Sequence, residues 1–374
     1  MVIVVTKKAK VLIHPIDRTW EVFRFCPHRM VANIYLGCEF ACAYCFARSI
    51  YPEYHEIIIA RINAAEKIDK EIVRLKKRGV RQPVDLGSAT DPYQPIEEKL
   101  ELTRKVLTEF LKHKMPVFVV TKSDLVLRDL DIIKALREEK LALVQFSLPT
   151  LDNFISQNFE GGSPAPEKRL RAIEELAEEG IRVIVRVQPV IPFINDHEEM
   201  LREVIEAASA AGAQHVIAGT LKLSETVLNN LSPVLKKFNK FEKFLRFYVA
   251  DGEIDSSGYL IPPHKYRLQI LSTLAKLTMK YKMTFGTCKE GFFDLHSHRC
   301  SGLDLNATYV PTIEHIIKYL RVKGKITLEE AIKVLKRLGA NAWYIRRFKK
   351  GWHENILFSD LPEVIYEKCS LRLK

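Results

Sequence analysis

The sequence predicts an α/β fold built on a mainly parallel sheet. Between residue 31 and about residue 220, short β-branched runs alternate with longer amphipathic stretches of helical period. Each short run is continuously apolar, as expected for strands that are covered on both faces. Six such βα units in series, joined by right-handed crossovers, form either a doubly wound sheet or an incomplete barrel.

The six units follow one another closely along the chain. The predicted strands are VANIYLG (31–37), VDLGSA (84–89), PVFVVT (116–121), LALVQFS (141–147), RVIVRVQPVI (182–191) and HVIAGT (215–220). The first five are followed by predicted helices at about 63–78, 98–112, 128–138, 166–178 and 196–210. The fourth helix is the best marked, because Pro166 stands at its start and Gly180 follows its end.

The ends of the chain differ from this pattern. The apolar run at the N-terminus predicts a strand, residues 225–285 look mainly helical, and two further helical patterns lie at about 311–321 and 327–338. We therefore expect an N-terminal extension (1–30), the βα repeat (31–225), a helical segment with a Cys/His loop that closes the sheet or barrel (226–310) and a basic helical tail (311–374).

Composition limits the class of protein. Of the 374 residues, 47% are hydrophobic and 28% are charged, which excludes wholesale disorder. No apolar run approaches the roughly 20 residues that span a bilayer, so no membrane partner is expected. The N-terminus lacks the features of a secretory signal, so we expect a cytoplasmic protein. Seven cysteines in that reducing compartment indicate metal or redox chemistry rather than disulfides.

The charge favours an anionic partner. The formal net charge is +12, and residues 311–374 supply 14 Lys/Arg against 7 Asp/Glu. This tail interleaves aromatic and basic residues, a pattern that suits phosphates and stacked bases, so we expect it to bind a nucleic acid substrate. The alternative is a solvated basic helix end whose aromatic side chains pack on the body of the protein. The interleaved residues are Trp343, Tyr344, Arg346, Arg347, Phe348, Lys349, Lys350 and Trp352.

Polar residues recur where the predicted strands end. Because the carboxyl ends of parallel strands form the ligand-binding edge of such folds, these side chains are expected to converge on one mouth. Each of them taken singly is more typical of a turn or a helix cap, but their recurrence at five strand ends favours a binding site. They are Cys38, Ser88 to Asp91, Lys122, Ser123, Ser147, Arg186 and Gln188.

The sharpest motif is GCEFACAYC (37–45), directly after the first strand. Its C-x3-C-x2-C spacing can wrap the thiolates of Cys38, Cys42 and Cys45 around one face of a [4Fe–4S] cluster and leaves the fourth iron without a protein ligand from this loop. The alternatives are a structural zinc site, which normally needs a fourth Cys or His nearby, and three unrelated buried cysteines. Neither alternative explains the strand-end position or the aromatic Tyr44 before the third cysteine.

This motif resembles the signature of the radical SAM superfamily, whose open iron binds S-adenosylmethionine (SAM). With GSATDPYQPIE (87–97), RLRAIEELAEEGI (169–181) and PVIPFIND (189–196), the chain is similar to the spore photoproduct lyase-like branch, often called DNA repair photolyases. The resemblance implies a partial (β/α)6 barrel with a mainly helical C-terminal extension. It also implies reductive cleavage of SAM to a 5′-deoxyadenosyl radical, with an electron donor of the ferredoxin or flavodoxin type.

The resemblance also implies roles for individual residues. Cys38, Cys42 and Cys45 are the iron ligands, and Tyr44 lies against the adenine. The polar contacts to the methionine part of SAM correspond to Thr90 or Ser88, Lys122 and Ser147. Arg186 and Gln188 are candidates for contact with the ribose or the substrate, or else form a satisfied polar pair inside the barrel.

A second group of cysteines and histidines lies in GTCKEGFFDLHSHRCSGLDL (286–305). Cys288, His296, His298 and Cys300 offer the donors of a zinc site or of part of a second cluster, although the spacing matches no familiar zinc module. The alternative is a loop closing over the barrel mouth without metal. Cys300 is also a candidate hydrogen donor, with Cys26 as a further one.

Spore photoproduct lyase carries a cysteine just past its second strand that returns hydrogen to its product radical. Here that stretch is Ser88-Ala89-Thr90-Asp91, without a thiol, so the resemblance does not imply this relay. The sequence favours a nucleic acid base as the substrate, in DNA or in tRNA. One alternative is an enzyme that acts on a small metabolite or a peptide. The other alternative is a non-enzymatic iron–sulfur protein that acts as a redox sensor or a nucleic-acid-binding module.

Overall fold

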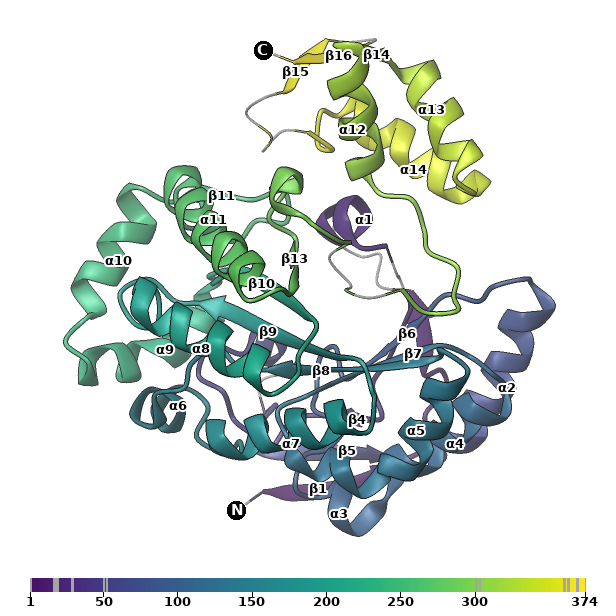
Figure 1. Cartoon of the computed structure of the whole chain (residues 1–374), viewed down its shortest axis with the longest axis vertical. Coiled ribbons are helices and arrows are strands. Elements are labelled where there is room, and N and C mark those ends of the chain that lie inside the picture. The colour runs from purple at the N-terminus through teal and green to yellow at the C-terminus, as the bar shows by residue number, and fades with distance from the viewer. Residues whose placement is uncertain are drawn as a thin grey trace.

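The computed structural model describes residues 2–15, 20–27, 30–49, 51, 53–299, 302, 304–358, 361, 364–367 and 370–373. Its centre is an eight-stranded sheet with strand order β13-β10-β9-β8-β7-β6-β3-β2 (Figure 1). Seven neighbouring strands are parallel, and β2 (Ile13–Pro15) pairs antiparallel with β3 at one edge. The parallel strands are β3 (Met30–Ala32), β6 (Val84–Leu86), β7 (Val117–Thr121), β8 (Ala142–Ser147), β9 (Val183–Val190), β10 (His215–Thr220) and β13 (Thr284–Thr287).

The predicted partial barrel is confirmed, and the sheet has one parallel strand more than predicted. β13 continues the sheet beyond β10, inside a region where the sequence pattern indicates mainly helix. Helices cover the outer face (Figure 1). The helices that pack in the main core on this face are α2 (Ala64–Lys77), α4 (Leu102–Lys112), η2 (Asp124–Asp129), α5 (Leu130–Glu138), α7 (Pro166–Glu178), α8 (Glu198–Ala210) and α11 (His264–Lys280). α6 (Asn153–Phe159), α9 (Glu225–Lys237) and α10 (Phe241–Ala250) form a separate cluster with the residues that follow β9 and β10, and α3 (Glu97–Leu100) lies between β6 and α4.

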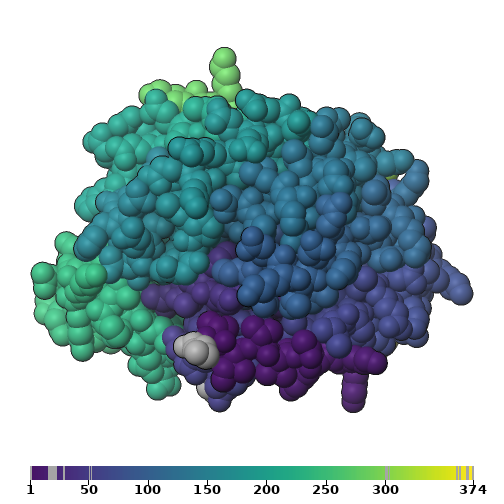
Figure 2. Space-filling model, turned by 90° about the horizontal axis from the view of Figure 1, so that it is seen from below, coloured from purple at the N-terminus to yellow at the C-terminus, as the bar shows by residue number. Residues whose placement is uncertain are grey.

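The first predicted strand divides between two sheets. After β3 the chain leaves the main sheet, and β4 (Tyr35–Leu36) joins β1 (Ile3–Lys7) and β5 (Ile57–Arg61) in a small sheet of order β1-β5-β4. This sheet carries the N-terminal segment, which lies on the face seen in Figure 2. The arrangement places the cysteine loop between β4 and the 3₁₀ helix η1 (Phe46–Ser49), next to the carboxyl ends of the parallel strands.

Both faces of the sheet are apolar, which explains the unbroken hydrophobic runs. Side chains such as Val117 and Val119 pack in the main core under the helices. On the opposite, inner face, Phe118, Leu143, Ile184 and Ile217 form a separate cluster with residues 305–309. Residues two apart along a strand lie on the same face of the sheet. The next inner-face residues towards the carboxyl ends are therefore Gln145 on β8 and Arg186 and Gln188 on β9, which are polar.

Residues 296–299 and 304–310 lie at the amino end of the barrel. The first stretch runs back along β13, since the backbone N–H of Ser297 donates to the carbonyl of Phe285 at 3.0 Å. The chain then passes the amino ends of the strands, where Asn306 N donates to Lys140 O at 2.8 Å and Val310 N donates to Pro27 O at 2.7 Å. Lys140 and Pro27 both precede strands. The loop therefore lies at the end of the barrel opposite the expected SAM-binding mouth.

The C-terminal residues fold into a compact unit instead of an open tail. Their elements are α12 (Ile313–Lys323), β14 (Lys325–Thr327), α13 (Leu328–Arg337), α14 (Ala342–His353), β15 (Val364–Glu367) and β16 (Ser370–Leu373). We call residues 313–373 the C-terminal unit. It has its own hydrophobic core, which also takes in Phe23 and Phe25 of α1 (Trp20–Phe25) and Phe293 of η3 (Phe293–Leu295). Figure 1 shows the unit at the end of the molecule opposite the N-terminal sheet.

Three of the four aromatic side chains predicted to meet stacked bases belong to this core. Tyr344, Phe348 and Trp352 are buried, so they stabilise the C-terminal unit and do not face a ligand. Trp343 remains 44% exposed and lies edge-on against Phe23. A short β11–β12 hairpin (Glu253–Ile254 and Leu260–Ile261) completes the described elements. Within the described residues, no helix is long and apolar enough to cross a membrane.

Candidate functional site

The cysteine loop is a tight turn with three thiols on it. Cys38 and Cys42 are buried and Cys45 is partly exposed. Gly37 begins the loop with φ +94°, and a Cβ at this position would lie 2.5 Å from the carbonyl oxygen of Ile57. Only glycine fits there, because both the backbone conformation and the space exclude a side chain.

The loop is held by hydrogen bonds from distant parts of the chain. Thr90 Oγ1 donates to the carbonyl of Gly37 at 2.5 Å, and Gln94 Nε2 donates to the same oxygen at 3.3 Å. On the other side, Ala43 N donates to the carbonyl of Phe159 at 2.9 Å. The segments after β6 and at the end of α6 therefore fix the positions of the thiols before any cofactor binds.

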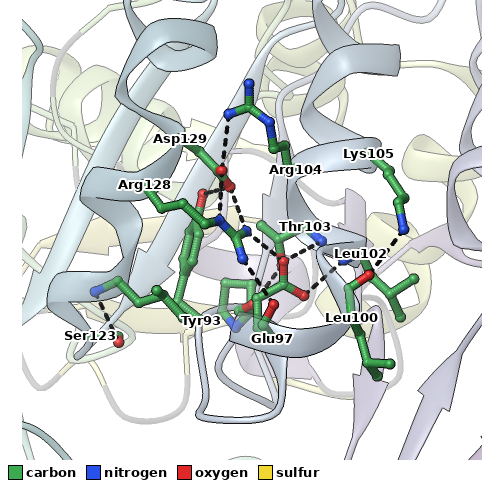
Figure 3. A network of polar contacts seen from close by, with 12 residues as sticks. Tyr93, Glu97, Leu100, Leu102, Thr103, Arg104, Lys105, Ser123, Arg128 and Asp129 are labelled. Carbon is green, nitrogen blue, oxygen red and sulfur yellow. Dashed lines mark hydrogen bonds and ion pairs between the residues drawn. The ribbon is translucent and has the colours of Figure 1, made fainter.

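A buried polar network fixes the segment that supplies Thr90 and Gln94 (Figure 3). Arg128 pairs with Glu97 at 2.8 Å and with Asp129 at 2.9 Å, and Tyr93 Oη donates to Asp129 at 2.9 Å. Burial raises the pKa of Glu97, although hydrogen bonds from Tyr35 and Arg128 oppose the rise. Each member of the network has partners, so the TDPYQPIE segment is rigid.

A charged cluster lies beside the cysteine loop. Glu160 and Arg169 form a buried ion pair at 2.6 Å, and Tyr44 Oη donates to the same carboxylate. The ammonium of Lys122 lies 3.7 Å from Glu160 and 5.7 Å from the centre of the Tyr44 ring. At 3.7 Å the lysine and the carboxylate attract each other but are not hydrogen-bonded.

The protonation states of this cluster follow from burial and charge. Burial favours a raised pKa for Glu160, but the positive charges of Arg169 and Lys122 outweigh it and lower the pKa. Burial opposes the charged form of Lys122, yet its electrostatic interactions with Cys42 and Glu160 outweigh that effect and raise its pKa. Lys122 is therefore a half-buried cation, and among the described residues its ammonium donates no hydrogen bond. Three donors remain available to a ligand.

Asp91 holds Lys122 in place. Its carboxylate accepts from Thr121 Oγ1 at 2.7 Å, from Tyr93 N at 2.9 Å and from the backbone N–H of Lys122 at 2.8 Å. It thus ties the end of β6 to the end of β7. Asp91 is a positioning residue, and its oxygens are already occupied within the protein.

The other predicted SAM contacts lie at the same edge of the sheet. Ser147 ends β8, and its carbonyl accepts from Arg169 at 3.1 Å. Ser88 follows β6, where its hydroxyl lies 3.5 Å from Asn33 Nδ2. Thr90, by contrast, uses its hydroxyl to hold Gly37. The structure brings Tyr44, Lys122 and Ser147 around one carboxylate–arginine pair, and the contacts of all these residues with SAM stay predictions.

Arg186 and Gln188 lie on the inner face of β9. Arg186 donates to Gln145 Oε1 at 2.7 Å and to Gln188 Oε1 at 2.6 Å, and its guanidinium lies 3.8 Å from the sulfur of Cys288. Gly219 on β10 makes room here, because a Cβ would lie 2.8 Å from Gln188 Nε2. The barrel therefore has a polar layer of amides, one guanidinium and one thiol above its apolar inner cluster.

The predicted second metal site is not assembled by the residues that the structure describes. His296 Nε2 accepts from Thr287 N at 3.1 Å, while the His298 ring lies 6.1 Å from that of His215 and Cys288 faces Arg186. Cys300 lies outside the described residues, so its roles as a ligand or hydrogen donor stay predictions. Cys26 is partly exposed. In the described ranges, three metal-binding side chains meet within 4.8 Å at Asp69, Glu109 and His113, where Lys112 also binds Asp69.

Sequence reasoning missed Glu160, Arg169 and Gln145. Glu160 follows α6 and is 2% exposed, and Arg169 is fully buried in the first turns of α7. Each looks like an ordinary charged helix residue. The one signal in the sequence was the GGSPAP stretch (161–166), which breaks the helix and returns the chain to the cysteine loop. There, Gly162 N donates to the carbonyl of Phe40 at 3.0 Å.

Comparison with known proteins agrees with this geometry. A family model described as the radical SAM superfamily matches residues 32–205, which run from β3 into α8. Residues 32–205 form a radical SAM domain. Spore photoproduct lyase complexed with dinucleoside spore photoproduct has the same fold, with a TM-score of 0.61 and 14% identity over 76% of this chain and 81% of that one. A variant of that lyase with bound AdoMet (SAM) and dinucleoside spore photoproduct has a TM-score of 0.59 and 13% identity over the same shares.

Two relatives show how far the sequence likeness extends. An uncharacterized protein of Mycobacterium tuberculosis is 29% identical over 265 residues, which cover 69% of this chain and 76% of the relative. A radical SAM Nalpha-GlyT isomerase of Pseudomonas phage M6 is 24% identical over 258 residues, or 68% of this chain and 52% of that protein. Both matches are longer than the family model's range.

The residues present fit the cofactors of a radical SAM enzyme, which are a [4Fe–4S] cluster and SAM. Around a single zinc ion, with Zn–S distances of about 2.3 Å, three thiols come within about 4 Å of one another. Among the described residues, the thiols of Cys38, Cys42 and Cys45 do not meet within 4.8 Å, so they fit a larger body than one ion. Lys122, with its free donors, suits a carboxylate such as that of SAM.

Proposed function

We propose that this radical SAM enzyme abstracts hydrogen from a base of a nucleic acid. When bound, the cluster and SAM supply a 5′-deoxyadenosyl radical that removes a hydrogen atom from the substrate. The observation that carries the proposal is the polar layer inside the barrel. Arg186, Gln145 and Gln188 present guanidinium and amide groups there, and such groups recognise the edges of bases by hydrogen bonding.

The protein's own residues supply the setting for this chemistry. Lys122 and the Glu160–Arg169 pair hold charge at the edge of the barrel, and Asp91 fixes the backbone of Lys122. Residues 304–310 lie across the amino end of the barrel, where Leu305 packs in the apolar inner cluster. A substrate inside the barrel is therefore shielded from water on that side, which protects a reactive radical from solvent.

Two further observations support a nucleic acid. Spore photoproduct lyase, which has a similar fold, binds a dinucleoside spore photoproduct. This chain's net charge of +12 favours an anionic partner. We also propose that the protein works in the cytoplasm with a ferredoxin- or flavodoxin-like electron donor.

The test is transfer of label. The reconstituted enzyme is incubated anaerobically with SAM, a reductant and DNA or tRNA carrying deuterium on its bases, and 5′-deoxyadenosine is analysed by mass spectrometry. Deuterium in 5′-deoxyadenosine is the expected result. Arg186→Leu should still cleave SAM without substrate but should lose the transfer. SAM cleavage without label from either polynucleotide would contradict the proposal and favour a metabolite or a peptide.

A further inference from the structure

The C-terminal unit contains a helix-turn-helix. α13 (Leu328–Arg337) and α14 (Ala342–His353) are joined by a turn of residues 338–341, in which Gly339 has φ +90°. Asn341 caps α14, because its side chain accepts from Tyr344 N at 2.8 Å. Two helices joined by a three- to four-residue turn with glycine are the core of this motif.

The surrounding elements complete a three-helix unit with a hairpin. α12 packs against α13, α13 packs against α14, and β15–β16 form an antiparallel hairpin that also pairs with β14. The order along the chain is helix, strand, helix, turn, helix and hairpin. In helix-turn-helix proteins the second helix of the motif enters the major groove of DNA. In this unit, that helix is α14.

One face of α14 is buried and the opposite face is basic. Tyr344, Ile345, Phe348 and Trp352 lie in the core of the unit. Arg346, Lys349, Lys350 and His353 are exposed and follow the spacing i, i+3, i+4, i+7, so they form one stripe along the helix. We call these four residues the basic stripe.

Within the described part of the chain, the basic stripe is not neutralised. Among the described residues, neither Arg346 nor Lys349 has an ion-pair partner, and Lys350 has only an exposed contact with Glu354 at 3.7 Å. α14 carries no acidic residue at all. Arg347 and Trp343 lie on a different side of α14, where both contact Phe23 of α1. The packing of α14 against α1 therefore leaves the basic stripe exposed.

We propose that α14 docks in the major groove of duplex DNA through the basic stripe. The groove of B-form DNA, about 12 Å wide, admits an α-helix, whereas the major groove of A-form RNA is too deep and narrow. The C-terminal unit then holds a DNA duplex while the barrel performs the chemistry. This inference specifies the partner of the function proposed above, and its test measures binding without SAM cleavage, so either proposal can fail alone.

The test compares two charge-reversal variants of the full-length, cluster-reconstituted protein. R346E/K349E/K350E reverses three residues of the basic stripe. R74E/K77E/R78E is the matched control, since Arg74, Lys77 and Arg78 are exposed at the C-terminal end of α2 with the same i, i+3, i+4 spacing. Binding to a fluorescein-labelled 30-base-pair DNA duplex is measured by anisotropy over a range of salt concentrations, and a duplex RNA of the same sequence is the competitor.

The stripe variant should bind DNA at least tenfold more weakly than the parent. Its salt dependence should fall by about 0.9 in log K per log salt for each lost phosphate contact, or about 2–3 in all. The control should bind like the parent, and duplex RNA should compete poorly. The proposal would be overturned if the stripe variant bound DNA as tightly as the parent, or if both variants lost the same affinity. It would also be overturned if duplex RNA competed as well as duplex DNA. Unchanged circular dichroism and iron content verify that the variants are folded.

Discussion

Lys122 is a cation whose side chain is only 16% exposed, and its ammonium donates no hydrogen bond to any residue that the structure describes. Burial of such a group is costly unless a partner supplies charge or acceptors, and Glu160 at 3.7 Å supplies charge only. Asp91 uses its carboxylate to fix the lysine backbone. The arrangement indicates that a ligand carboxylate completes the coordination of the ammonium.

We predict that Lys122→Met weakens SAM binding without loss of the cluster. Removal of a charge-assisted hydrogen bond costs about 1.5–3 kcal/mol, which is roughly a 10- to 150-fold loss of affinity. Equilibrium dialysis with labelled SAM measures the affinity, and the iron content is measured in parallel. Lys114→Met, an exposed lysine paired with Glu139, is the control. An unchanged SAM affinity in Lys122→Met would remove this residue from the site.

At the residue scale, the sequence predicts the parts of the site that depend on local spacing. The three cysteines and Tyr44 lie within nine residues, so their grouping is visible in the chain. Glu160 and Arg169 meet Tyr44 only because α6 and α7 pack beside the cysteine loop. A pairing across 116 residues leaves no periodic trace in the sequence.

At the scale of elements, strand ends and turns set the geometry of the site. The six predicted strands are visible as apolar runs because both faces of the sheet are covered. β13 (TFGT) lacks the run of apolar residues that marks the six predicted strands, and it is recognised as a strand only by pairing with β10. The C-terminal pattern of aromatic and basic residues is also ambiguous by itself. Its division into a buried and an exposed face requires the packing of α12 and α13.

Gly162 is where the helix α6 returns to the cysteine loop. A Cβ there would lie 2.4 Å from the carbonyl oxygen of Glu39, a backbone atom that cannot easily move. We predict that Gly162→Ala destabilises the apo protein by about 1–3 kcal/mol and lowers iron incorporation. Urea unfolding and iron analysis measure the two effects.

The neighbouring Gly161→Ala is the control, because its Cβ would meet only Gln157 O, at 3.1 Å. If both variants unfold and bind iron alike, close packing at Gly162 does not hold the loop.

His215 at the start of β10 makes stability depend on pH. Burial, followed by the nearby His298 and His296, lowers its pKa to about 3 from an ordinary value near 6.5. Above pH 6.5 the imidazole is neutral in both states. As the pH falls below 6.5 only the unfolded state takes up the proton, so stability is lost progressively towards pH 3.

In the parent, we expect His215 to lower the unfolding free energy by about 2 kcal/mol when the pH falls from 7.5 to 5. We predict that this part of the decrease is absent from His215→Asn. Chemical denaturation of the parent and the variant at both pH values measures this difference. The same loss in both proteins would show that His215 is not the titrating group.

At the scale of the whole molecule, α1 joins the barrel to the C-terminal unit. Phe23 is fully buried, stacks on Tyr344 at 4.6 Å and lies under Arg347. This one side chain from before the first barrel strand thus belongs to the core of the last 60 or so residues. The connection places the helix-turn-helix at a defined position on the enzyme.

We predict that Phe23→Ala costs about 3–5 kcal/mol, mainly by loosening the C-terminal unit. Limited proteolysis should release a C-terminal fragment faster than in the parent, while SAM cleavage continues because the barrel residues are intact. Val322→Ala, at an 83% exposed position of α12, is the control. Release at the same rate in Phe23→Ala and the parent would show that α1 does not secure the unit.

The central claim is that the loop of Cys38, Cys42 and Cys45 makes this protein a SAM-cleaving enzyme. The most direct test measures 5′-deoxyadenosine formed from SAM under anaerobic, reducing conditions by the parent, by C38A/C42A/C45A and by Cys26→Ala, which lies outside the loop. The parent and Cys26→Ala should form 5′-deoxyadenosine and carry iron, and the triple variant should do neither. Formation of 5′-deoxyadenosine by the triple variant, or its absence from the iron-loaded parent, would contradict the claim.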